Sequence, residues 1–448
     1  MPSWKHIKIA IRDRFIGRRA AASLTSAEQF AVVGARRAWR RLQGRCPQCH
    51  RLAKSIARFA APEGQTFFGY YDLTPFNRTG NRLLAVVAPK ANRTPRAGES
   101  IRVGYFDRRE PQRFVTIGTT STWCWQQGCR VRWHPGDEEQ QIVYNRLVNK
   151  RYGTVIQDLR SGEVTHQYGR AAYDLDSRGE WSLSLNFSRL QRLRPGYGYV
   201  DLPDETAGDA FPERDGIWLT EVKTGISELI VSLSFLRRFE PSRSMVSAEH
   251  YINHLSFSPS GAAFLFFHLW ITEGPRLCSR LIVCKRDGSD PRVVVDCGSV
   301  SHYHWKSDDE LLVTVNFAKG PTRYWLYGDS FQRVTTLGDG VLRADGHPSF
   351  APDGALLLTD TYPDRYGDQH LLLLDASGNL MELSRFFLPV RWRGETRCDL
   401  HPRWDRTGRA ICIDSAHEGR RALYVIDIDT GSRGLRSPSE SNATQENP

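Results

Sequence analysis

Short apolar runs separated by polar turns follow one another along most of the chain, with the lengths and two-residue spacing typical of β-strands. One stretch can be divided strand by strand. Residues 262–268, 280–286 and 292–296 each have a strand pattern, and Asp287 and Gly288 between the last two predict a hairpin turn. With the apolar run that ends at Phe257, these segments predict a unit of four antiparallel strands.

This unit recurs, and its mark is an aromatic residue followed by a turn that contains Pro, Asp or Gly. Clear copies lie at residues 254–261, 347–354 and 401–408, a more degenerate one at 302–309, and weaker ones at 76–80, 133–137 and 175–179. Seven units of four strands predict an all-β fold, a seven-bladed β-propeller with a short helical basic arm at its N-terminus. A sandwich or barrel would not need a repeat of this length.

The domain boundaries follow from where the repeats begin and end. We assign residues 1–62 to the basic helical arm, residues 63–432 to the propeller and residues 433–448 to a polar disordered tail. A strand exchanged between the two ends would close the ring of blades, and residues 67–71 are our candidate for pairing with the last blade.

The net charge of +11 belongs almost entirely to the arm. Residues 1–60 contain 14 Lys and Arg and two acids, whereas the remaining 388 residues carry 47 basic and 48 acidic side chains. The propeller is therefore nearly neutral, and its charge alone does not indicate an acidic partner.

Trp4, Ile7, Ile11 and Phe15 fall on one face of a predicted helix whose other positions are largely basic. Such a helix suits an anionic membrane surface, with the arm of residues 1–60 as the contact. It is equally compatible with a helix that packs on the propeller, and nucleic acid is the least favoured partner. A second helix is expected from about Ser26 to Gly44, opened by a capping box.

The pattern Cys46-x-x-Cys49-His50 matches that of c-type haem attachment, but the sequence has no export signal. Half of a zinc site and two ordinary thiols are the other interpretations, and we favour the thiols. The nine cysteines are scattered and odd in number, which argues against a disulfide framework. No apolar run is long enough to span a membrane. These features predict a cytoplasmic protein, with peripheral attachment to the inner membrane face through the arm as an option.

Four consecutive units place a histidine three residues before their aromatic residue: His254, His302, His347 and His401, with Arg130 at the same position of the second unit. Equivalent positions of the innermost strands face one central channel, so these side chains should form a partial ring. Other polar residues fall close to the same strand ends, namely His250, Asn253, His268, His304, Asp345, Asp360, Asp399 and Asp414.

Converging imidazoles can hold a divalent metal ion with open positions, and a further histidine near them can act as a base. The alternative is that each histidine caps a strand end and bonds to nearby backbone. Four histidines in register, from only 13 in the chain, favour a site.

The last four units resemble the oligogalacturonate lyase family of seven-bladed propellers. The words that carry the resemblance are His-Leu-Ser-Phe-Ser-Pro at 254–259, Phe-Phe-His at 266–268, Ser-His-Tyr-His-Trp at 301–305, and His347 followed by Ser-Phe-Ala-Pro-Asp-Gly at 349–354. The resemblance implies β-elimination of acidic, uronic-acid oligosaccharides with a divalent metal such as manganese.

On the family's pattern, His302 and His347 would be metal ligands and His254 the catalytic base, with Arg130 helping the ion to neutralise the substrate carboxylate. His401 has no counterpart and is a candidate third ligand. Tyr70, Tyr71 or Tyr303 would protonate the leaving oxygen, and the spacing does not choose between them.

This sequence departs from the family in three ways. The family's paired histidines near His347 are reduced to one, its glutamine is replaced in the stretch 343–345, and the basic arm is foreign to it. A second hypothesis therefore stays open: a non-catalytic propeller that binds a glycan or protein partner in a membrane-associated polysaccharide biosynthesis complex. A serine hydrolase is disfavoured because the chain has no Gly-x-Ser-x-Gly motif.

Overall fold

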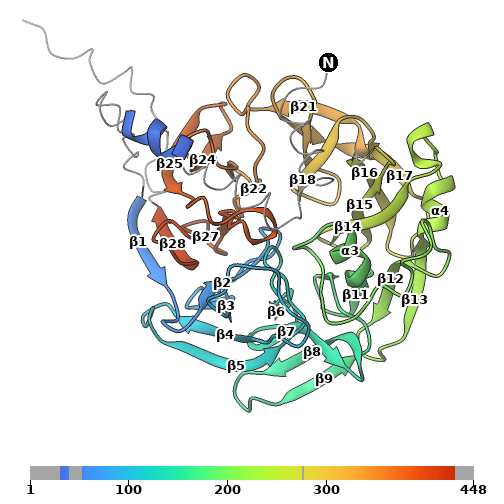
Figure 1. Cartoon of the computed structure of the whole chain (residues 1–448), viewed down its shortest axis with the longest axis horizontal. Coiled ribbons are helices and arrows are strands. Elements are labelled where there is room, and N and C mark those ends of the chain that lie inside the picture. Colours follow the sequence, from blue (N-terminus) through green and yellow to red (C-terminus); the bar gives the residue numbers. More distant parts are fainter. Residues whose placement is uncertain (1–30, 40–52, 275–276, 429–448) are drawn as a thin grey trace, which may run out of the picture.

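Seven four-stranded antiparallel sheets surround a central axis (Figure 1). The computed structural model describes residues 31–39, 53–274 and 277–428. This architecture confirms the seven-bladed β-propeller predicted from the repeats. The predicted arm helix around Trp4, the Cys46–Cys49–His50 motif and the polar tail lie outside the described residues.

Six of the sheets are built from four strands that follow one another in the sequence. Blade 1 contains β2 (Gln65–Phe67), β3 (Arg82–Ala88), β4 (Ile101–Asp107) and β5 (Phe114–Thr120), and blade 2 contains β6 (Arg132–His134), β7 (Asp137–Val148), β8 (Arg151–Asp158) and β9 (Val164–Tyr168). Blade 3 contains β10 (Asp174–Leu175), β11 (Trp181–Ser184), β12 (Gly216–Glu221) and β13 (Ser227–Ser232), and blade 4 contains β14 (Glu249–Phe257), β15 (Ala263–Ile271), β16 (Leu277–Lys285) and β17 (Arg292–Val295). Blade 5 contains β18 (Ser299–Trp305), β19 (Leu311–Asn316), β20 (Arg323–Tyr327) and β21 (Arg333–Leu337), and blade 6 contains β22 (Ser349–Phe350), β23 (Leu356–Asp360), β24 (Asp368–Asp375) and β25 (Leu380–Phe387).

The seventh sheet closes the ring with strands from both ends of the chain. It contains β26 (Arg403–Trp404), β27 (Ala410–Ser415), β28 (Ala422–Ile428) and, as its outer strand, β1 (Ala53–Phe59). β1 runs antiparallel to β28, with Ile56 opposite Ile426. The last repeat supplies only three strands in the described region, so the fourth comes from the N-terminal side.

This closure corrects our expectation for residues 67–71. Phe67 belongs to β2 and pairs with Val86 of β3 inside blade 1, so it is not available to the last blade. The closing strand β1 instead begins at Ala53, within the stretch that we had assigned to the arm.

Two α-helices lie in connections between strands: α3 (Phe187–Leu193) between β11 and β12, and α4 (Leu233–Arg238) between β13 and β14. Short 3-10 turns occupy Arg243–Met245, Asp329–Phe331 and Gly394–Thr396. Residues 31–39 are helical, inside the second helix expected in the arm. No helix in the described ranges is long and apolar enough to cross a membrane.

The helix at residues 31–39 packs on the outer edge of blade 6 through Arg36, which donates to the Arg365 carbonyl oxygen, and through Arg37 (Figure 1). The guanidinium of Arg37 lies 2.5 Å from Asp368 and 4.1 Å from the centre of the Phe387 ring. Trp39 is 63% exposed and Val32 is 46% exposed, so the apolar side chains of this helix are not what attaches it.

The innermost strand of blade 1 is interrupted, and this interruption builds the centre of the molecule. β2 ends at Phe67, and pairing with β3 resumes only at Phe76, which bridges Leu83. The intervening residues turn inward at Gly69, whose φ of +136° and close approach to the Gln127 carbonyl leave no room for a side chain. The excursion carries Tyr70 and Tyr71 toward the axis.

Candidate functional site

The four histidines predicted to share a ring lie together, buried at the centre of the propeller. The ring centroids of His302 and His347 are 4.2 Å apart, and those of His347 and His401 are 4.4 Å apart. His254 joins the group through Tyr70, against which it stacks with a centroid distance of 5.1 Å. The register inferred from the repeats therefore places all four side chains in one cluster.

The ring of Tyr70 lies next to all four histidines of this cluster. Besides His254, its ring lies 6.4, 5.9 and 4.9 Å from those of His302, His347 and His401. Its hydroxyl makes no hydrogen bond to any described residue. Burial raises the pKa of this phenol well above its ordinary value, so Tyr70 keeps its proton.

The excursion that carries Tyr70 is held by blade 7. Arg403 donates to the carbonyl oxygens of Gly69 and Tyr70, and Asp414 accepts from the backbone N–H of Gly69. His401 adds a hydrogen bond of 2.7 Å between its Nδ1 and the Gly69 carbonyl oxygen. The first and last repeats thus meet at the site as well as in the closing sheet.

Tyr71 has a different role, because its hydroxyl is already occupied. It donates to the carbonyl oxygen of Tyr303 at 2.7 Å and accepts from the backbone N–H of the same residue at 2.9 Å. The ring also contacts those of His302 and His347. Of the three tyrosines proposed from the sequence as proton donors, Tyr71 is held by Tyr303 through its hydroxyl. The hydroxyls of Tyr70 and Tyr303 have no hydrogen-bond partner in the described chain, and the Tyr70 ring contacts all four histidines.

Hydrogen bonds to one nitrogen of three imidazoles leave the other nitrogen available. Nδ1 of His302 lies 3.1 Å from Asp345, and Nδ1 of His347 lies 2.8 Å from Asp360. Nδ1 of His401 faces the Gly69 carbonyl, as described above. An acceptor at Nδ1 fixes the proton there, so each Nε2 carries a lone pair, as metal-binding histidines require. Nε2 of His401 is buried with no hydrogen-bond partner in the described chain.

Three of the buried side chains could hold a metal ion together. Ligand atoms of His347, Asp399 and His401 all lie within 4.8 Å of one another. Two imidazoles and a carboxylate are a donor set that suits divalent manganese or iron, and the orphaned Nε2 of His401 supports this fit. His302 lies against His347 but outside this group, whereas Asp399, named from the sequence only as a neighbour, is inside it.

Two carboxylates control the electrostatics around these rings. Although burial disfavours the anion, His302 and the hydrogen bonds that the Asp345 carboxylate accepts from Ser301 and Asn316 hold the pKa of Asp345 at about 2. Burial lowers the pKa of His302, and His347 lowers it further. Burial also opposes the charged form of His347, but Asp360 outweighs it and raises the pKa of that imidazole.

His254 is set up as a neutral imidazole. Burial, together with the positive charge of Arg194, lowers its pKa well below the ordinary value. Its Nε2 lies 3.1 Å from the Asn253 amide nitrogen, and its Nδ1 lies 3.3 Å from the Tyr173 hydroxyl. Since the amide nitrogen donates, the lone pair of His254 sits on Nε2.

The backbone at three equivalent positions is in the left-handed region. Arg130, His254 and His401 have φ values of 55°, 58° and 44°. Non-glycine residues adopt this conformation at a cost of about 1–3 kcal/mol, and it concentrates at functional sites. The shared strain places their side chains at the centre in the same way from three blades.

Arg130 lies at the predicted place, but its charge is already compensated. Its guanidinium makes two hydrogen bonds to Asp72, of 3.0 and 2.9 Å, and lies 4.3 Å from the centre of the Tyr173 ring. The predicted role of Arg130 toward a substrate carboxylate stays a prediction.

An uncompensated arginine comes from a part of the chain without repeats. Arg194 follows α3 and lies 4.5 Å above the Tyr197 ring, which is itself 6.1 Å from His254 and 6.2 Å from Tyr70. It forms no ion pair with any described acid. Arg397, by contrast, is bound to Asp399 by two hydrogen bonds, of 2.6 and 2.7 Å. Sequence analysis missed Arg194 because the connection between β11 and β12 is an insertion, so alignment of the repeats leaves it out.

Other polar residues near the ends of these strands stabilise the fold and are not part of the site. His250 and His268 share a hydrogen bond of 2.8 Å, and Arg280 donates to His268 while its other nitrogens bind backbone carbonyls at the end of α4. The ring of His304 packs on Phe350, and burial lowers its pKa to about 4. None of these four residues contacts the rings of the central cluster.

Solved structures with this architecture include two oligogalacturonate lyases. An oligogalacturonate lyase in complex with manganese superposes with a TM-score of 0.60 at 16% sequence identity, covering 86% of this chain and 96% of the other. The oligogalacturonate lyase from Vibrio parahaemolyticus superposes with a TM-score of 0.56 at 13% identity and the same coverage of 86% and 96%. The resemblance seen in the last four repeats is thereby confirmed at the level of the fold, over nearly the whole propeller. No protein-family model and no curated protein sequence matches the chain.

Proposed function

We propose that the protein is a metal-dependent lyase that cleaves an acidic, uronic-acid glycan by β-elimination. The observation that carries the proposal is the arrangement of a neutral His254 beside an unpaired Arg194, close to a buried group of two histidines and one carboxylate. An elimination next to a carboxylate needs all three: a base, a cation for the carboxylate and an electrophile for the developing charge.

We assign the metal to His347, His401 and Asp399, with His302 beside them as the candidate for a fourth contact. A bound divalent ion such as manganese would withdraw electron density from the substrate carboxylate and so acidify the proton on the neighbouring carbon. Asp360 would orient two of the ligands, because its carboxylate accepts from Nδ1 of His347 and from the backbone N–H of His401.

The protein's own groups then divide the reaction between them. Arg194 binds the uronate carboxylate, and Nε2 of His254 exchanges its bond to Asn253 for the proton on C5. The C5–H electron pair forms the C4–C5 double bond while the C4–O bond breaks. Tyr70 gives its proton to the departing oxygen, and the products are an unsaturated uronate and a shortened glycan. Burial keeps both His254 and Tyr70 in the neutral forms that these roles require.

A panel of uronic-acid polymers tests the proposal, with the ultraviolet absorbance of the unsaturated product as the signal. We expect product from the wild type with manganese and none from His254→Ala, whereas His304→Ala, a buried histidine outside the cluster, should keep its activity. Product formation at the wild-type rate by His254→Ala would show that another group is the base. No product from any uronic-acid polymer would refute the lyase.

A second candidate function is glycan or partner binding without catalysis, at a membrane surface. The specific observation in its favour is the helix at residues 31–39, which keeps Trp39 63% exposed and Val32 46% exposed next to a strongly basic segment. Aromatic and basic side chains together suit an anionic lipid interface. The test is sedimentation with phosphatidylserine vesicles at low salt, comparing the full chain with a variant that lacks residues 1–52 but keeps β1. Equal sedimentation of the two would exclude the arm as the anchor.

A further inference from the structure

A polar cavity lies between blades 2 and 3. It has a volume of about 550 Å³ and is lined by residues from β8, β11, β12 and the connections next to them. None of the four central histidines lines it. Its features are three arginines, a tryptophan and one buried hydroxyl, and each of these groups has unused binding capacity.

The three arginines are Arg151, Arg170 and Arg214, and none forms an ion pair with any described acid. The guanidinium of Arg170 lies flat over the Trp218 ring, 3.4 Å from its centre. Burial lowers the pKa of Arg170; Asp215 works against this effect and neighbouring Arg151 adds to it. Three cations gathered without an ion-pair partner among the described acids favour the binding of an anion.

The acids in the lining do not compensate these cations. The oxygens of Asp215 are occupied by the side chains of Asn186 and Thr206 and by the backbone N–H of Gly216, at 2.7, 3.0 and 2.8 Å. Glu205 is exposed and makes no ion pair within the described chain. The cavity therefore retains a net positive charge.

The hydroxyl of Ser184 is an independent sign of a ligand. The residue is 1% exposed and lines the cavity, and its Oγ has no hydrogen-bond partner within the described chain. A buried hydroxyl without a partner costs about 1–3 kcal/mol, and a bound polar group would recover part of it.

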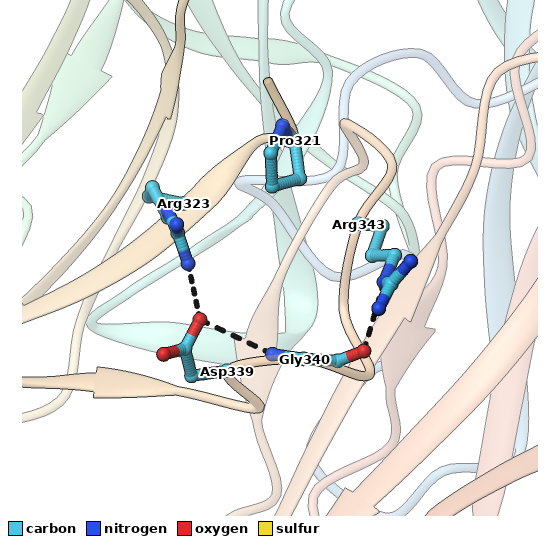
Figure 2. Close-up of a pocket in the computed structure, with 5 residues that line it drawn as sticks. All are labelled: Pro321, Arg323, Asp339, Gly340 and Arg343. Carbon is cyan, nitrogen blue, oxygen red and sulfur yellow. Dashed lines mark hydrogen bonds and ion pairs between the residues drawn. The ribbon is translucent and has the colours of Figure 1, made fainter.

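A comparison with another cavity shows what distinguishes this one. The pocket in Figure 2, lined by Pro321, Arg323, Asp339, Gly340 and Arg343, also contains two arginines. There, however, Arg323 is paired with Asp339, and Arg343 donates to the Gly340 carbonyl oxygen at 2.9 Å. Its cations are paired within the protein, whereas those of the cavity between blades 2 and 3 form no ion pair with any acid in the described ranges.

The connection between β11 and β12 joins this cavity to the central site. Its start, at Asn186 and Ser188 around α3, and its end, at Arg214, line the cavity. Its middle supplies Arg194 and Tyr197 to the histidine cluster. One insertion therefore forms part of both sites, and an extended polymer that reached from one site to the other would run along this connection.

We propose that this cavity is a second subsite, which binds an anionic sugar residue of the same acidic glycan away from the point of cleavage. The proposal takes its ligand class from the proposed function. Arg170 and Arg214 would bind carboxylate groups, Trp218 would pack on a sugar face, and the Ser184 hydroxyl would bond to a sugar oxygen.

Binding and cleavage can be measured separately, with polygalacturonate as the probe. Binding is measured by calorimetry in the presence of a chelator, for the wild type, Arg170→Ala, Trp218→Ala and the exposed charge reversal Arg214→Glu. The matched control is Arg333→Ala, because Arg333 also lies over a tryptophan, Trp325, at 4.7 Å, but lines no part of the cavity. A methyl-esterified polymer serves as the uncharged probe.

We expect each arginine variant to weaken binding about tenfold, the effect of one hydrogen-bonded charge. Trp218→Ala should weaken it through the loss of packing on a sugar face, and the control should bind as the wild type does. The esterified polymer should bind weakly to every protein. Wild-type affinity in all three cavity variants would overturn the subsite, and so would equal competition by a single-stranded oligonucleotide. Binding that depends on Arg170 without any cleavage would keep the subsite and refute the lyase. Cleavage by the wild type, together with unchanged binding by the cavity variants, would keep the lyase and refute the subsite.

Discussion

Replacing Asp360 by asparagine should weaken metal binding while leaving the shape of the site unchanged. Asp360 is fully buried on β23 and contacts two of the proposed metal ligands, which come from different blades. One oxygen accepts from Nδ1 and the backbone N–H of His347, both at 2.8 Å, and the other accepts from the backbone N–H of His401 at 3.2 Å. Asparagine has the same size but only one acceptor oxygen and no charge.

Two effects of the substitution can be given a size. A ligand histidine that loses its carboxylate partner typically binds metal about 10–100-fold more weakly, or about 1.4–2.7 kcal/mol. If the asparagine oxygen keeps both bonds to His347, its amide group faces the N–H of His401, and a buried N–H without an acceptor costs about 1–3 kcal/mol of stability. The apo variant should therefore also unfold more easily.

The assay is a manganese titration against a competing chelator, together with urea unfolding of the apo protein. Asp345→Asn is the matched control, because Asp345 holds His302, which lies outside the group formed by His347, His401 and Asp399. We expect Asp360→Asn to have the larger effect on manganese affinity. Equal affinity in the wild type and Asp360→Asn, or a larger loss in Asp345→Asn, would refute the assigned ligand set.

Three further predictions concern the substrate, the closing sheet and pH. Arg194→Ala should raise KM for a uronic-acid polymer about tenfold or more, since a charge-assisted bond is lost, while metal content stays unchanged; an unaltered KM would remove Arg194 from the site. Deleting residues 1–60 removes β1 and unpairs β28, so it should lower the melting temperature well below that of a chain lacking residues 1–52, and equal melting temperatures would contradict the closure. Asp364 raises the pKa of His370, burial opposes this rise, and Glu382 adds to it. The imidazolium therefore stabilises the fold below the unfolded pKa of about 6.5, and this stabilisation is lost as pH rises through the pKa of the folded state. His370→Gln should then cost more stability at about pH 5 than at about pH 8, and equal losses at both would contradict it.

The repeats made the blades and the register of the histidines predictable. Each unit has an aromatic residue at a constant distance from a turn, and the turn keeps its geometry because a glycine with positive φ, such as Gly261 or Gly354, occupies the same place. In a closed ring, equal positions point to one axis, so the sequence alone assigns His254, His302, His347 and His401 to one site.

The parts that escaped prediction have no counterpart in the other units. Arg194 lies in an insertion, and Asp399 lies in the connection between blades 6 and 7, where no repeat spacing predicts that its carboxylate comes close to His347 and His401. Tyr70 reaches the centre only because blade 1 interrupts its inner strand. The closing strand β1 lacks the aromatic residue and turn by which the other units were recognised, because it completes a blade from the opposite end of the chain.

The central claim is that His347, His401 and Asp399 bind a divalent metal ion at the axis of the propeller. The most direct measurement is elemental analysis of protein that has been loaded with manganese and then desalted, for the wild type and for His401→Ala, with His304→Ala as control. The account predicts close to one metal ion per chain in the wild type and the control, and almost none in His401→Ala. Metal-free wild type, or equal metal content in all three proteins, would contradict it.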